Sequence, residues 1–122
     1  MVDKVNLAQA FSQFADCWSP KIAGDINEMQ VKLVKLSGEF IWHHHDHEDE
    51  MFLVVEGKLL MRFRDKDVYL DPGEFIIVPK GTEHLPVAET GVCQVLLLEP
   101  KTTLNTGNVE NDRTVKELQR LS

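Results

Sequence analysis

The chain has 122 residues, of which 43% are hydrophobic and 27% charged, an ordinary globular composition that excludes general disorder and suits one domain over residues 1–122. Its formal net charge is −7 without any basic stripe, which argues against nucleic acid and anionic membranes as partners. No apolar run approaches the ~18 residues of a membrane span, and the N-terminus is too polar for a secretory signal, so we expect a cytoplasmic protein.

The N-terminal segment is predicted to begin with a short amphipathic helix over residues 6–14. Four apolar residues recur there at helical spacing: Leu7, Ala10, Phe11 and Phe14. Asn6 is a suitable N-cap. Ser19-Pro20 should end any helical structure, and Gly24-Asp25 indicates a turn.

Residues 29–100 have the texture of an all-β protein, in which short apolar runs are separated by Gly, Pro and Asp. The expected strands are Gln30–Leu36, Glu39–His45, Glu50–Val55, Lys58–Arg64, Val68–Leu70, Glu74–Val78, His84–Ala88 and Val92–Glu99. The Lys58–Arg64 run alternates and so predicts one buried face. The alternation of Gln30–Leu36 breaks after Leu33, which indicates either a bulge or two covered faces. The regular succession of short strands and turn residues predicts an antiparallel sandwich or barrel core over about 29–100.

The pattern stops after Pro100, and residues 101–122 are interpreted as a C-terminal tail. Thr102–Asn111 is polar and should be a loop. Residues 112–121 carry spaced apolar residues, with Thr114 and Glu117 placed as a capping box. They predict either a short C-terminal helix or a frayed end.

Four of the five histidines occupy positions 43, 44, 45 and 47. On an extended strand His43 and His45 share one face, with imidazoles roughly 6–7 Å apart, whereas His44 points the other way. Glu50 reaches the same face only if residues 46–49 turn the chain into a second strand. His44 and His47 are interpreted as solvated side chains.

His84, the only other histidine, follows a tight turn and is the candidate fourth ligand. Three imidazoles and one carboxylate suit a divalent transition metal: Fe, Mn, Ni, Cu, Co or Zn. The alternatives are satisfied core histidines or surface histidines and, for Glu50, one more acid in an acidic turn. The metal-site hypothesis is favoured by the joint spacing of His43, His45, Glu50 and His84.

These residues resemble the two motifs of the cupins. The first motif, G-x5-H-x-H-x3,4-E-x6-G, is matched by His43, His45, Glu50 and Gly57, although Gly38 stands one residue closer than the pattern asks. The second, G-x5-P-x-G-x2-H-x3-N, is matched by Gly73, Pro79, Gly81 and His84, with Ala88 in place of the final Asn. The resemblance implies a double-stranded β-helix, or jelly-roll barrel, with a metal inside and a homodimeric state.

Three functions are compatible with such a site. The first is a metal-dependent enzyme, a dioxygenase or an isomerase, acting on a small organic molecule; no catalytic acid or base stands out. The second is a non-enzymatic small-molecule binding or sensor module, and the third a structural metal site with a closed coordination shell. The interior strand faces are apolar, and Arg62 and Arg64 lie on the opposite parity. An interior with few cations argues against sugar phosphates and favours a small, mostly neutral or aromatic ligand.

Overall fold

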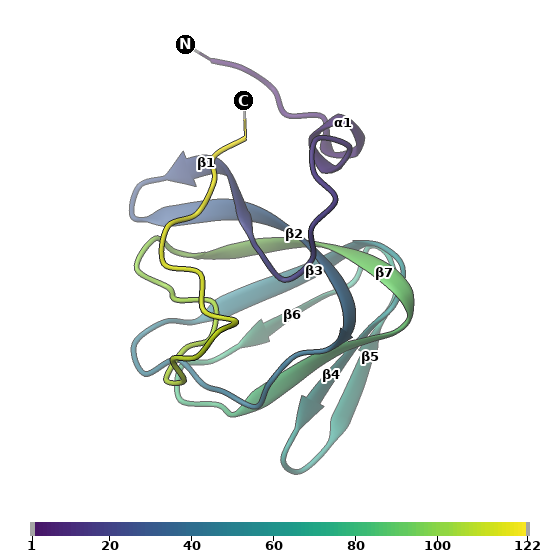
Figure 1. Ribbon diagram of the computed structural model, residues 1–122, viewed down its shortest axis with the longest axis vertical. Coiled ribbons are helices and arrows are strands. Elements are labelled where there is room, and N and C mark those ends of the chain that lie inside the picture. The colour runs from purple at the N-terminus through teal and green to yellow at the C-terminus, as the bar shows by residue number, and fades with distance from the viewer. Residues whose placement is uncertain (1, 122) are drawn as a thin grey trace.

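Antiparallel β-structure dominates residues 2–121, which are the residues that the computed structural model describes (Figure 1). The elements are α1 (Leu7–Phe11), β1 (Lys21–Ile26), β2 (Met29–Glu39), β3 (Glu50–Glu56), β4 (Leu59–Phe63), β5 (Asp67–Leu70), β6 (Phe75–Val78) and β7 (His84–Pro100). No helix among the described residues is long and apolar enough to cross a membrane. The expectation of an all-β jelly-roll architecture is confirmed.

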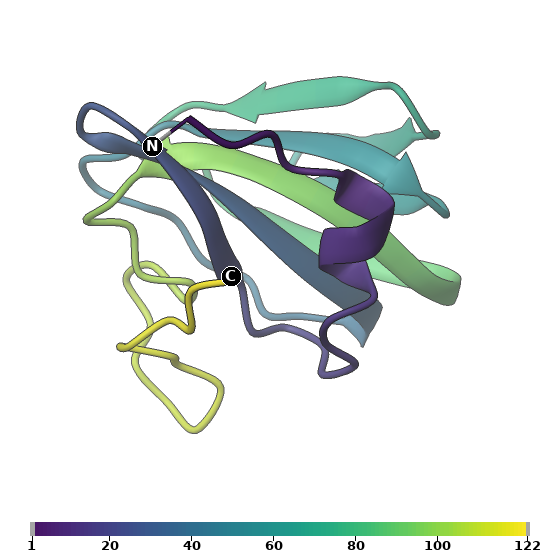
Figure 2. The same cartoon turned by 90° about the horizontal axis from the view of Figure 1, so that it is seen from above.

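The long strand β7 connects the two halves of the fold. It runs beside β2 and, on its other edge, pairs first with β4 and then with β3. The sheet order is β1-β2-β7-β3-β6, and β4 additionally pairs with β5. The ladders curl around a common interior without closing into a complete barrel, since no pairing joins β5 to β6 among the described residues (Figures 1 and 2).

The hydrophobic core lies between the curled strands. It contains Val34, Leu36, Phe52, Val54, Leu59, Met61, Leu70, Val78, Ala88, Cys93, Val95 and Leu97. Leu59 and Met61 are fully buried on the face expected for Lys58–Arg64, but Leu60 on the opposite face is also buried, in a second cluster. Leu33 is also fully buried, but it packs on the outer face of the sheet under Phe11 of α1. Both faces of β2 are therefore covered, and its pairing with β7 has no register shift before Leu36.

Several predicted strand boundaries were wrong. Gly24-Asp25 does not form a turn, because β1 continues through it with a bulge and pairs with β2 as an additional strand. β2 likewise runs through Ser37-Gly38 to Glu39, and residues 40–45 are extended without belonging to a strand. The expected strands His84–Ala88 and Val92–Glu99 are one strand, β7, which bulges between them. Ladder hydrogen bonds with neighbours distant in sequence outweigh these local turn signals.

The two chain ends differ in outcome. The N-terminal helix is confirmed, although it is shorter than residues 6–14, and the Asn6 side chain accepts from the Gln9 backbone N–H at 3.0 Å. The predicted C-terminal helix was wrong, because residues 101–121 form a series of turns along one side of the barrel (Figure 2). Asn105 helps to fix these turns: its side-chain amide donates to the Arg113 carbonyl, and its side-chain oxygen accepts from the Val115 N–H.

Candidate metal centre

Three separate segments bring the four predicted ligands together. His43 and His45 lie in the extended segment after β2, Glu50 begins β3 and His84 begins β7. One potential ligand atom from each residue lies within 4.8 Å of those of the other three. All four side chains are buried, and His84 is fully inaccessible to solvent. Their clustering agrees with the sequence expectation that they share one site.

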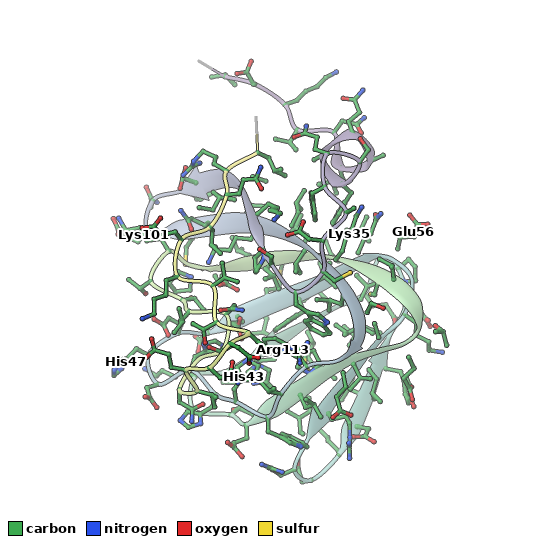
Figure 3. The ribbon with its side chains drawn as sticks, in the orientation of Figure 1. Lys35, His43, His47, Glu56, Lys101 and Arg113 are labelled. Carbon is green, nitrogen blue, oxygen red and sulfur yellow. The ribbon has the colours of Figure 1, made fainter. Side chains whose placement is uncertain are left out.

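Backbone pairing between two distant segments aligns the histidines. The His43 N–H donates to the His84 carbonyl at 3.1 Å, and the His84 N–H donates to the His43 carbonyl at 2.9 Å. The alternation of an extended chain then turns His43 and His45 inward and His44 outward. His44 contacts the exposed Asp46 carboxylate, 2.9 Å from its Nε2. His47 lies at the surface, away from His43 (Figure 3).

The turn before β3 places the carboxylate. The Asp49 side chain accepts from the Lys80 N–H at 2.8 Å, and the His45 carbonyl accepts from the Gly81 N–H at 2.7 Å. Residues 46–49 thus turn the chain as predicted, so Glu50 faces the histidines. Its Oε1 lies 2.8 Å from His45 Nε2 and 3.2 Å from the Nε2 of His84.

Hydrogen bonds to backbone carbonyls orient two of the rings. His43 Nδ1 lies 2.9 Å from the Ile41 carbonyl oxygen, and His84 Nδ1 lies 2.9 Å from that of Thr82. A carbonyl only accepts, so we assign the proton to Nδ1 in both rings. That assignment leaves each Nε2 with a free lone pair. Metal-binding histidines commonly have this arrangement, in which one ring nitrogen binds the metal and the other donates its N–H to a carbonyl or carboxylate.

Three inward-facing atoms at this site are buried without hydrogen-bond partners: His45 Nε2, Glu50 Oε1 and His84 Nε2. Orphaned buried polar atoms are costly, and a bound cation would satisfy all of them together. Burial opposes ionisation of Glu50, but the adjacent imidazoles of His45 and His84 outweigh this effect and lower the pKa of Glu50. The donor set therefore fits a divalent transition metal, with a carboxylate and imidazoles in ligating form.

Burial and, to a smaller extent, the charge of the nearby His84 lower the pKa of His43 from 6.5 to about 4. At pH values between these two pKa values, the unfolded chain binds more protons at His43 than the folded chain does. The free energy of unfolding therefore decreases as the pH falls. For metal-free protein we expect this residue to contribute about 2–3 kcal/mol of the loss between pH 7.5 and 4.5. Urea unfolding at both pH values measures it. The His43→Asn variant should lose correspondingly less stability over the same interval, and an equal loss would contradict the assignment.

A pocket adjoins the four residues, and the sequence reasoning missed its polar wall. Lys32 and Glu99 line this pocket together with His43 and Glu50. The Lys32 Nζ lies 2.8 Å from Glu99 Oε2, and both side chains are almost completely buried. The expectation of an interior with few cations therefore needs correction, although Arg64 does lie outside, over the Trp42 ring. The sequence signals were charged residues next to apolar ones, Lys32 in β2 and Glu99 in β7.

Aromatic residues and the C-terminal segment (residues 101–121) contribute further parts of the pocket wall. The rings of Trp18 and Phe40 stack with their centroids 4.7 Å apart. The Arg113 guanidinium lies 4.8 Å from the Phe40 ring centroid, and Figure 3 shows Arg113 in the region of His43. Asn105 also lines the pocket. The loop-rich end of the chain thus helps to build the candidate site.

Comparison with known proteins places this arrangement in context. Residues 31–99 match the family of cupin domains. The fold is similar to a cupin-2 domain protein of Shewanella frigidimarina, with 43% identity, a TM-score of 0.78 and coverage of 80% of this chain and 94% of the other. It is also similar to a protein of Neisseria meningitidis, with 32% identity, a TM-score of 0.74 and coverage of 81% and 100%.

A curated relative extends over a shorter stretch. The chain is 43% identical over 61 residues to the uncharacterized protein YdbB of Bacillus subtilis. This match covers 49% of the chain and 54% of YdbB, so it spans about half the length of that relative.

Proposed function

Because this chain belongs to the cupin domain family, we propose that His43, His45, Glu50 and His84 hold a divalent transition-metal ion at which a small organic molecule binds. The observation that carries the proposal is the set of buried, partnerless ligand atoms facing one another. Iron, manganese, nickel, copper, cobalt and zinc are all compatible with three imidazoles and a carboxylate.

The adjoining pocket favours a metal-dependent enzyme over a purely structural metal. A structural site is closed by its ligands, whereas here Glu50 and His43 form part of a pocket wall. When bound, the ion would supply Lewis-acid or redox chemistry to a ligand in that pocket. We therefore propose a dioxygenase or isomerase type of reaction on a small molecule. The chain's own residues orient this ligand and exclude water through the Trp18–Phe40 wall.

Elemental analysis of untagged protein tests the metal site. Wild type should contain close to one equivalent of metal, whereas Glu50→Ala and His84→Ala should each lose most of it, because each removes one of four ligands. His47→Ala is the matched control, since this histidine lies in the same stretch but is exposed, and it should retain the metal. Equal metal content in all four proteins would refute the assignment.

We propose in addition that two copies of the chain associate through the outer face of β6. Phe75 and Ile77 are 60% and 57% exposed on this strand, and they pair with Leu53 and Met51 of β3. An exposed apolar face at a sheet edge favours association. Sedimentation should give a dimer for wild type and a monomer for Phe75→Glu, with Val92→Glu as the exposed control outside this strip. A monomeric wild type would exclude the dimer.

A further inference from the structure

The buried ion pair between Lys32 and Glu99 is the one charged feature of the pocket that the proposed metal site does not use. The two residues come from neighbouring strands, and Lys32 pairs with Leu97 while Gln30 pairs with Glu99. Lys32 is 1% exposed and Glu99 2%. A charged pair so deep inside a domain gives little net stability compared with apolar residues of the same size. Its position in the pocket wall suggests a role toward a ligand.

The pair has unused hydrogen-bonding capacity. An ammonium has three N–H donors, and the Lys32 group has one hydrogen-bond acceptor among the described residues, Glu99 Oε2. Glu99 Oε1 is buried and has no partner. Burial and the charge of Glu50 raise the pKa of Glu99, against the opposing effect of Lys32, so the two carboxyl groups influence one another. The pocket therefore presents donors next to the proposed metal ligands.

Charge counting indicates what such a pocket accepts. This step rests on the proposed function: a divalent ion with three neutral imidazoles and the Glu50 carboxylate leaves one positive charge. Lys32 and Glu99 add no net charge while both are ionised and one further positive charge when Glu99 is protonated, so the site is cationic in either state. A single negative charge on the ligand would balance the site. Phe52, Val34 and Leu97 also line the pocket, and such apolar walls disfavour a strongly hydrated, multiply charged anion such as phosphate.

We propose that the ligand of this pocket is a small organic carboxylate with an apolar body, and that Lys32 is its positioning residue. One oxygen of the carboxylate accepts a hydrogen bond from the Lys32 ammonium, and the group lies on the side of the pocket that carries His43 and Glu50. The apolar part packs against the Trp18–Phe40 wall. Glu99 holds the ammonium in place by the 2.8 Å contact and limits its net charge.

Calorimetric titration of Mn(II)-loaded protein with benzoate and with its neutral analogue benzamide tests this proposal. Wild type should bind benzoate at least about tenfold more tightly than benzamide, the effect of one charge-assisted hydrogen bond. Lys32→Met should abolish this preference. Glu99→Gln, which leaves the ammonium uncompensated, should strengthen benzoate binding by about three- to tenfold. A structural disturbance would instead weaken binding in both variants.

The controls separate this proposal from the metal site. Arg64→Met removes an exposed cation outside the pocket and should leave the preference unchanged. Metal content is determined for each sample, and circular dichroism checks its folding. Loaded wild-type protein that binds both compounds equally, or neither, overturns the carboxylate proposal while the metal site stands. Protein that takes up no metal overturns both. The wild-type comparison decides the preference for a carboxylate even if a variant fails to fold, and the loss of that preference in Lys32→Met decides the role of Lys32.

Discussion

Replacing Lys32 alone by methionine is expected to lower the free energy of unfolding by about 3–5 kcal/mol, one of the largest effects of any single change in this chain. Methionine fills a similar volume, so the loss comes from the charge. Glu99 would remain buried without its 2.8 Å partner and would have to take up a proton or stay ionised in an apolar interior. Urea unfolding of metal-free protein at pH 7.5 measures the loss.

The double variant Lys32→Met/Glu99→Met is the matched control for this effect. Its stability should lie within about 1 kcal/mol of wild type or exceed it, because both charges are replaced by apolar groups. The cost of the single Lys32→Met change should also shrink at lower pH, since the pKa of Glu99 is already raised by burial and protonation removes its charge. A double variant whose loss equals the sum of the two single losses would contradict the prediction.

The second large effect is expected at Gly107, where Gly107→Ala should cost about 2–4 kcal/mol and weaken metal binding. Gly107 has a φ of +55°, and a Cβ there would lie 2.1 Å from the His44 carbonyl oxygen. The segment must therefore move. The hydrogen bond from the Asn108 N–H to the His44 carbonyl and that from the His44 N–H to Asn108 Oδ1 would be strained or lost.

The link to the metal site follows from the position of His44 between two of the proposed ligands. A Cβ at residue 107 would also approach His43 Cδ2 to 3.2 Å, so the displacement reaches the imidazole itself. Competition with a metal-sensitive dye should show a lower affinity in the variant. Gly24→Ala is the control, because no atom lies within 4 Å of a Cβ there and φ is not positive. It should change stability by less than about 0.5 kcal/mol. Equal behaviour of the two variants would refute the role of Gly107.

The candidate ligand set was accessible from the sequence because its spacing is local. His43 and His45 share a face in any extended segment, whether or not it belongs to a strand, so the parity argument held although residues 40–45 are not in a ladder. The polar residues 46–49 were sufficient to predict a turn that places Glu50 on the same side as His43 and His45. His84 was identified because it is the one remaining histidine of the sequence and follows a turn. In the structure, its backbone pairing with His43 brings the two side chains together. The short apolar runs between turn residues similarly predicted most of the strands that contribute the hydrophobic core.

The sequence by itself determined which residue types are available to the candidate site, the alternation that buries Leu59 and Met61, and the helix capped by Asn6. Only the tertiary structure decided that Lys32 meets Glu99, 67 positions away, that Gly24 lies in a strand, and that residues 101–121 form turns rather than a helix. Periodicity reports which face of an element is apolar. It contains no information on the register between distant strands, and that register selects which buried charges become neighbours.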